Sequence, residues 1–109
     1  MMNGDDEIPK VRLGKREFEV PEFKWGEVRK LAPLLRRCSK VNWDELPEDD
    51  FQAIGDLIHL VMSRVEPSIQ RSDLDDMPGL GINQISAAVP VILRQAGMEA
   101  APKGEAAAG

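Results

Sequence analysis

The segment PKVRLGKREFEVP, at residues 9–21, constrains the fold of this chain more than any other feature. Apolar and charged residues alternate with a period of two on either side of Gly14 and Lys15. Such alternation is typical of two half-buried strands, and a central glycine is typical of the tight turn that joins them. The sequence therefore predicts a β-hairpin over residues 9–21.

The side-chain pattern also selects the register of this hairpin. A two-residue turn places Val11 opposite Phe18 and Leu13 opposite Arg16, which gathers the large apolar side chains on one face and pairs opposite charges on the other. A three-residue turn would place Phe18 opposite Arg12 and mix the two faces, so the shorter turn is predicted. Because a ribbon of two short strands is marginal alone, its apolar face must pack on the helical body or on a partner chain.

The rest of the chain shows helical periodicity, and three apolar stripes, expected to face inward, begin at Trp25, Phe51 and Ile82. Four helical segments are expected, the third of them a short turn, at about residues 25–39, 48–65, 73–77 and 82–96. The predicted fold is α+β and mostly helical, with an N-terminal two-stranded β-hairpin followed by three to four helices. It should form a single globular domain over residues 8–98, between a disordered leader at 1–7 and a disordered, alanine-rich tail at 99–109.

Local sequence signals predict where these helices begin, end or bend. Ser72 with Asp75 resembles a capping box at the start of the short turn, and Gly97 is the expected C-cap of the last helix. A proline inside a helix removes one backbone hydrogen bond and crowds the preceding turn. Pro33 should therefore kink or restart the first helix, and Pro90 should kink the last one.

Charge and composition exclude several classes of protein. The formal net charge of -5 argues against nucleic acid as a partner, because binding to phosphates needs a surplus of Lys and Arg. No apolar run approaches the roughly 18 residues of a membrane span, and residues 1–7 are acidic where a signal peptide would be basic. The one cysteine, Cys38, falls on the apolar side of a helix, which predicts a buried thiol in a reducing cytosol.

No constellation of catalytic or metal-binding residues stands out in the sequence. His59 is the only histidine and shares the polar side of its helix with Gln52 and Asp56, which predicts a solvated side chain rather than a general base. One histidine and one distant cysteine lack the spacing of metal ligands, and the PGLG segment lacks the lysine of a phosphate-binding loop. We therefore expect no enzymatic activity, no metal and no cofactor.

Two groups of residues are candidates for contact with another protein. Arg29 and Arg36 lie seven residues apart in a basic strip on an otherwise acidic protein, which is either a solvated face or a docking surface for an acidic segment. The aromatic residues Phe23, Trp25 and Trp43 lie next to predicted element boundaries, where they either close a core or anchor a partner.

Helix 48–65 adds a further candidate. Leu57, Leu60 and Met62 make its apolar arc broader than one stripe. The helix should therefore lie between two neighbouring elements or contribute to an oligomer interface, and Met62 completes the set of candidate partner-binding residues. The spacing of residues 72–96 also suits a helix-turn-helix, although Arg94 is the only basic residue of its second helix and the acidic balance argues against groove insertion.

The run VRLGKREFEVPEFKWGEVRKLAPLL resembles the opening of the tail assembly chaperones, a family of small tail assembly proteins of bacteriophages and prophages. The resemblance covers about the first third of the chain, and the helical remainder is similar only in character. The family pattern combines a turn of Gly-Lys or Asn-Gly, a Phe or Tyr before Val-Pro, and a helix entry of the form aromatic-Gly-x-Val/Leu-Arg. The corresponding residues here are Gly14, Lys15, Phe18, Val20, Pro21, Trp25, Gly26, Val28 and Arg29. None of these residues is catalytic.

This resemblance implies a protein of the host bacterial cytoplasm that binds the long helical tape measure protein and keeps it soluble during tail morphogenesis. Tail tube subunits are further candidate partners, and nucleic acid and membranes are not expected. Two alternatives stay open, namely a structural virion component of the tail or head-tail junction and a helix-turn-helix-like regulator. A homo-oligomer is also compatible with the sequence.

Overall fold

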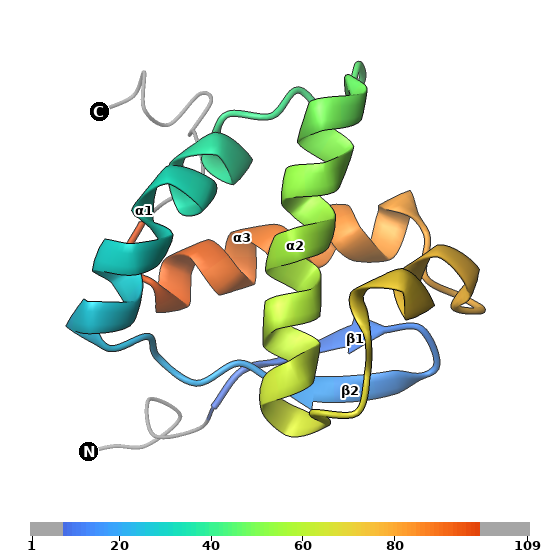
Figure 1. Ribbon diagram of the computed structural model, residues 1–109, viewed down its shortest axis with the longest axis horizontal. Coiled ribbons are helices and arrows are strands. Elements are labelled where there is room, and N and C mark those ends of the chain that lie inside the picture. Colours follow the sequence, from blue (N-terminus) through green and yellow to red (C-terminus); the bar gives the residue numbers. More distant parts are fainter. Residues whose placement is uncertain (1–7, 99–109) are drawn as a thin grey trace.

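A computed structural model describes residues 8–98 of the 109-residue chain (Figure 1). The predicted leader at 1–7 and tail at 99–109 lie outside these residues. The fold is α+β, as predicted, with a two-stranded antiparallel hairpin followed by helices. In chain order the elements are β1 (Lys10–Leu13), β2 (Arg16–Glu19), α1 (Trp25–Ser39), α2 (Glu48–Val65), the 3-10 helix η2 (Arg71–Asp76) and α3 (Ile82–Gln95).

The hairpin has the register that its side chains predict. Val11 lies opposite Phe18 and Leu13 opposite Arg16, across a two-residue turn in which Gly14 has a φ of +68°. This φ lies in the left-handed region, which a glycine adopts without the steric penalty of a side chain. The apolar face of the hairpin is buried, and its members are Val11, Leu13, Phe18 and Val20.

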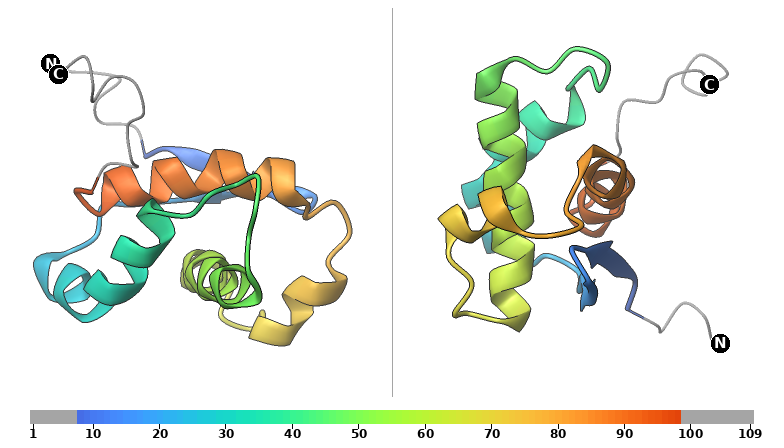
Figure 2. Two further views of the ribbon diagram at one scale, coloured as in Figure 1. Left: turned by 90° about the horizontal axis from the view of Figure 1, so that it is seen from above. Right: turned by 90° about the vertical axis from the view of Figure 1, so that its right-hand side faces the viewer.

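The hairpin packs on the helical body, which resolves the alternative that the sequence left open. Strand β1 lies against α3, and β2 lies against α2 (Figures 1 and 2). Gln84 of α3 fixes the turn, because its Oε1 accepts the Gly14 N–H at 2.7 Å and its Nε2 donates to the Gly14 carbonyl at 3.0 Å. Gly79, with a φ of +83°, approaches the same turn so closely that an added Cβ would lie 3.2 Å from the Gly14 carbonyl oxygen.

Helix α2 occupies the centre of the fold. Its first turn carries three carboxylates, which favour the positive end of the helix dipole. It packs against α1, α3, β2 and η2, so the interpretation that this helix lies between neighbours is confirmed. Its buried side chains are Ala53, Ile54, Leu57, Ile58, Val61 and Met62.

Three details differ from the sequence predictions. Helix α1 is continuous through Pro33, so the predicted restart is wrong; the packing of its buried residues Leu35 and Cys38 offsets the one hydrogen bond that the proline removes. The short turn is a 3-10 helix that begins two residues earlier than predicted. It is capped by Asp73, whose Oδ2 accepts the Gln70 N–H at 2.8 Å, and not by Ser72 with Asp75.

The end of α3 agrees with its prediction. Gly97 has a φ of +81°, and its N–H donates to the Arg94 carbonyl at 3.0 Å. The Met98 N–H donates to the Leu93 carbonyl at 2.8 Å. These two bonds form a Schellman motif, which satisfies carbonyls that the helix end would otherwise leave free.

Candidate functional site

The histidine and the acidic side chains are the groups that could serve a catalytic or metal site. Among residues 8–98, no group of three or more His, Cys, Asp or Glu side chains is arranged to hold a metal ion. His59 is partly buried rather than solvated, which corrects the sequence prediction. Its Nε2–H donates to the Ile69 carbonyl at 2.8 Å, so the ring joins α2 to the segment that leads into η2. Within residues 8–98, no helix has the length and apolarity that a membrane span requires.

The thiol of Cys38 is buried, as predicted. Desolvation raises its pKa to about 11, and the nearby carboxylate of Asp50 adds to the shift. A thiol with such a pKa stays protonated at neutral pH, and the thiolate is the nucleophilic form. The environment of Cys38 is therefore that of a core residue.

Two of the candidate partner-binding residues lie in the core. Met62 has no exposed surface, and Phe23 is only 9% exposed. The guanidinium carbon of Arg64 covers the Phe23 ring at 4.6 Å from its centroid. Both side chains are thus covered in this structure, which agrees with core closure, the other role that the sequence left open for Phe23. Met62 is buried because its helix has neighbours on several sides.

Trp43 and Trp25 have different surroundings. Trp43 lies in the loop after α1, is partly buried and packs against the core. Trp25 is the first residue of α1 and is 75% exposed. The prediction that Trp25 belongs to the inward stripe of this helix is therefore wrong, because α1 meets its neighbours with residues farther along, including Leu35 and Cys38. An exposed tryptophan is a frequent anchor in protein interfaces.

The start of α1 is held to α2 by a charged contact. Glu27 accepts the Lys24 N–H at 2.9 Å and forms an ion pair with Arg64. The hydrogen bond from the Lys24 backbone, followed by the bond from Arg64, holds the pKa of Glu27 below its ordinary value. This pair fixes the position from which Trp25 projects.

The exposed side of α1 joins several of the candidate residues into one surface. Residues separated by four and seven positions lie on one side of a helix, and this relation links Trp25, Arg29 and Arg36, with Lys40 directly after the last turn. All four are exposed. We call this surface the α1 stripe. Within residues 8–98, none of its cations belongs to an ion pair, whereas Arg37, on another side of the helix, pairs with Asp50 at 2.8 Å.

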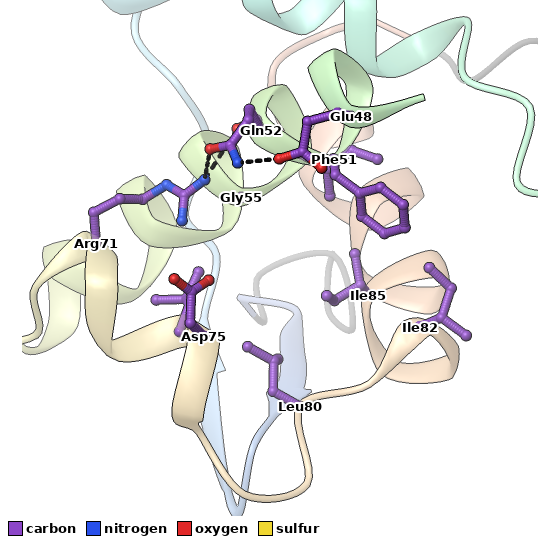
Figure 3. A pocket seen from close by; sticks show the side chains of 11 residues that line it. Glu48, Phe51, Gln52, Gly55, Arg71, Asp75, Leu80, Ile82 and Ile85 are labelled. Carbon is purple, nitrogen blue, oxygen red and sulfur yellow. Dashed lines mark hydrogen bonds between the residues drawn. The ribbon is translucent and has the colours of Figure 1, made fainter. Parts of the chain in front are cut away.

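A second surface was not predicted from the sequence. A groove of about 400 Å³ opens between α2, η2 and α3 (Figure 3). Phe51 and Ile82, predicted to point inward, are 49% and 44% exposed at this groove. The two helices diverge here, so side chains near their N-termini are not covered. The apolar lining consists of Phe51, Ile54, Leu74, Leu80, Ile82 and Ile85.

The rim of this α2–η2–α3 groove is acidic. Glu48 and Asp75 line it, and neither is part of an ion pair within the described residues. The one lining cation, Arg71, is already engaged, because its Nε donates to Asp56 at 2.9 Å and its Nη2 donates to the Gln52 side chain at 3.0 Å. The rim therefore presents two carboxylates that belong to no ion pair in residues 8–98, and Glu48 already accepts a hydrogen bond from the Gln52 side chain at 2.7 Å.

Gly55 provides the space for the Arg71 side chain. A Cβ at this position would overlap the guanidinium group, so a side chain here would displace Arg71 from α2 (Figure 3). The sequence offers an isolated helical glycine as the only sign of this contact. Its meaning depends on η2, which lies beside α2 only in the folded chain.

The segment that would form the first helix of a helix-turn-helix is not an α-helix. The segment before α3 is a six-residue 3-10 helix, whereas that motif requires two α-helices joined by a short turn. Helix α3 also buries Ala88, Val89, Ile92 and Leu93 against the hairpin and the other helices.

Comparison of the chain with protein families, with curated proteins and with solved structures gives no match. The functional conclusion therefore rests on the α1 stripe, the α2–η2–α3 groove and the motif at the start of the chain.

Proposed function

We propose that this protein is a phage tail assembly chaperone, which binds the tape measure protein through the α1 stripe and keeps it soluble during tail morphogenesis. The observation that carries the proposal is Trp25, 75% exposed at the head of three exposed cations that have no ion-pair partner within residues 8–98. The resemblance of the first third of the chain to tail assembly chaperones supports the same function.

The α1 stripe suits a helical partner. At about 1.5 Å per residue, the distance from Trp25 to Lys40 corresponds to roughly 22 Å along the helix. A partner helix with an apolar residue for the indole and carboxylates spaced along the same side would match this length. Tryptophan and arginine are also the residue types that most often dominate interface energetics.

The proposal places the protein in the host bacterial cytoplasm, where the tape measure protein is made. A helical protein of great length exposes many amphipathic segments before it is enclosed. Many weak contacts of one small domain with such segments keep the apolar sides from associating with each other. The tail tube subunits, which later enclose the tape measure, are further candidate partners.

The test is co-expression with the tape measure protein of the same phage or prophage. We expect that protein to be soluble with the wild-type chain and insoluble with the Arg29→Glu/Arg36→Glu variant, since both changes reverse charge on the α1 stripe. Lys15→Glu is the control for a charge reversal elsewhere, because Lys15 is exposed in the hairpin turn and neither strand of the hairpin packs against α1. If the tape measure protein is equally insoluble with and without this chain, the proposal fails.

A second measurement separates the chaperone from a structural subunit. An assembly chaperone leaves before the particle is complete, so purified virions should lack this chain. Stoichiometric amounts of the chain in finished particles would overturn the proposal in favour of a structural role.

A further inference from the structure

The outer side of strand β1 is a free edge of the hairpin. The Val20 N–H donates to the Pro9 carbonyl at 2.9 Å, so these two residues form a hydrogen-bonded pair across the hairpin. In an antiparallel pair, residues bonded to the neighbouring strand alternate with residues whose N–H and C=O groups point away from it. In β1 and the turn, the row that points away from β2 therefore consists of Lys10, Arg12 and Gly14.

Helix α3 already satisfies one member of this row as an added strand would. The side-chain amide of Gln84 accepts the Gly14 N–H at 2.7 Å and donates to the Gly14 carbonyl at 3.0 Å. A carboxamide carries the same kinds of donor and acceptor as a peptide group. Among residues 8–98, no hydrogen bond engages the outward backbone groups of Lys10 or Arg12. Two N–H donors and two carbonyl acceptors of this edge are thus available to a partner.

A groove of about 370 Å³ runs along this edge, between β1 and α3. Strand β1 and helix α3 lie side by side (Figures 1 and 2). Small side chains leave room above the helix, namely Ala87, Ala88 and Val91. The charged lining residues are the cations Lys10 and Arg12, and neither belongs to an ion pair within residues 8–98. We call this surface the β1–α3 groove.

We propose that the β1–α3 groove binds an extended, acidic segment of another protein, which adds to β1 as a third, antiparallel strand. The available backbone groups select an extended partner, because a helix uses its own N–H and C=O groups internally. Antiparallel pairing is also slightly more stable per residue than parallel pairing. This inference goes beyond the proposed function and uses neither the α1 stripe nor the α2–η2–α3 groove.

Charge favours an acidic segment over a basic one. Across the hairpin, Lys10 faces Glu19 and Arg12 faces Glu17, whereas no carboxylate lines the groove on the other side of β1. Opposite charges stabilise a pair of neighbouring strands, and like charges directly opposite each other destabilise it. An acidic third strand would give each cation a carboxylate on both sides.

The antiparallel arrangement also predicts the sequence pattern of the segment. Residues opposite Lys10 and Arg12 share their face of the sheet, so the acidic side chains belong there. The residues between them point to the other face, where Ala87 and Val91 leave room for β-branched side chains. The preferred segment therefore alternates Glu or Asp with Val or Ile over about five residues, which is slightly longer than β1.

The probe for the test is a capped synthetic peptide, Val-Glu-Val-Glu-Val, titrated into the full-length chain and followed by NMR. We expect a dissociation constant on the order of 1 mM, because a short, flexible ligand loses much entropy on binding. The largest amide shifts should fall on Lys10, Arg12 and Ala87. Hydrogen exchange of the Lys10 and Arg12 N–H groups should also slow, because the added strand accepts their hydrogen bonds.

Matched peptides separate strand pairing from simple attraction of charges. Methylation of both glutamate nitrogens removes the N–H groups that face β1, and the affinity should fall at least about tenfold. Methylation of the central valine nitrogen leaves those donors in place and is the control, with affinity close to that of the unmodified peptide. A peptide with lysine in place of glutamate should bind about tenfold more weakly.

Matched variants of the chain test the cations. Lys10→Gln/Arg12→Gln keeps the backbone edge, and its affinity for the glutamate peptide should fall about threefold to tenfold. Lys24→Gln/Lys30→Gln makes the same change in net charge elsewhere and should bind as the wild type does. All four side chains are exposed, so both variants should fold, which circular dichroism will verify. Ala87→Glu, at an exposed helix position, should weaken binding without any change in the hairpin.

Several results would overturn the proposal. These are equal binding of the peptide methylated at glutamate, shifts confined to other surfaces, and no shift at concentrations up to about 10 mM, ten times the expected dissociation constant. Shifts at Lys10 and Arg12 on concentrating the chain without peptide would assign the groove to a second copy and would also overturn it. The titration needs no tape measure protein, so its failure leaves the co-expression test unaffected.

Discussion

Helices α1 and α2 have similar amphipathic sequences and very different surroundings. Helix α2 buries six of its 18 residues, because α1, α3, β2 and η2 all pack against it. Helix α1 buries two of its 15 residues and packs against α2 and α3. Met62 and Trp25 both looked like candidate binding residues, yet the first is in the core and the second in solvent. A surplus apolar residue is available to a partner only on a helix at the periphery.

The largest expected effect is at Met62, on the central helix. Met62→Asp would place a charge where no solvent reaches, and we expect destabilisation above about 4 kcal/mol and loss of the folded state. Urea denaturation followed by circular dichroism measures it. Met62→Leu conserves the volume and should cost less than about 1.5 kcal/mol. A folded Met62→Asp protein would contradict the enclosure of this side chain between α2 and its neighbours.

A smaller effect is expected at Gln84, which holds the hairpin that covers α2. Gln84→Ala leaves the buried N–H of Gly14 without its acceptor and should cost about 1–3 kcal/mol. Its neighbour Asn83 is exposed, so Asn83→Ala should change stability by less than about 0.5 kcal/mol. Equal losses in the two variants would contradict the role assigned to the Gln84 contact.

The ion pair between α1 and α2 should contribute less and should depend on pH. Because the pKa of Glu27 is lowered on folding from its ordinary 4.5, the stabilisation is fully present above that pH and is lost as the pH falls through the folded value. We expect the free energy of unfolding of the wild type to exceed that of Glu27→Gln by less than about 1 kcal/mol at pH 7, since the carboxylate is partly exposed.

This difference should shrink toward zero in acid. Thermal unfolding from pH 7 to pH 3 measures it, with Glu45→Gln, a change in an exposed loop residue, as the control. A difference that increases on acidification would contradict the direction of the pKa shift.

The smallest effect on stability is expected at Trp25. Trp25→Asp should change the free energy of unfolding by less than about 0.5 kcal/mol, because most of the side chain is in water and a carboxylate at the first helical position is favourable. Trp43→Asp should destabilise the fold clearly, since Trp43 packs against the core. Urea denaturation in dilute solution checks both, and the opposite order would reverse the roles of the two tryptophans.

The sequence predicted those parts of the fold that depend on local patterns. The hairpin register followed from the need to keep Phe18 away from charged neighbours, and the bounds of α1 and α2 followed from helical periodicity. The cap at Gly97 followed from its position after the last apolar residue. The predicted start of η2 is wrong, because Gln70 and Asp73 occupy the cap positions expected of Ser72 and Asp75.

Local sequence patterns predict only part of the candidate site. Arg29 and Arg36 belong to one helix, so their common side follows from spacing alone. The α2–η2–α3 groove combines residues from three segments, and periodicity within one segment cannot show where two helices diverge. This is why Phe51 and Ile82 were expected in the core and lie instead at the edge of the groove.

The amino-acid sequence is enough to predict the hairpin and the helices, because strand pairing in a hairpin and helical periodicity depend on residues close together in the chain. The packing of the elements settles which apolar residues stay exposed, that Gln84 holds a turn 70 residues away, and that Gly55 makes room for Arg71. These outcomes depend on which elements become neighbours. A side chain is buried when another element covers it, and a local pattern does not contain that information.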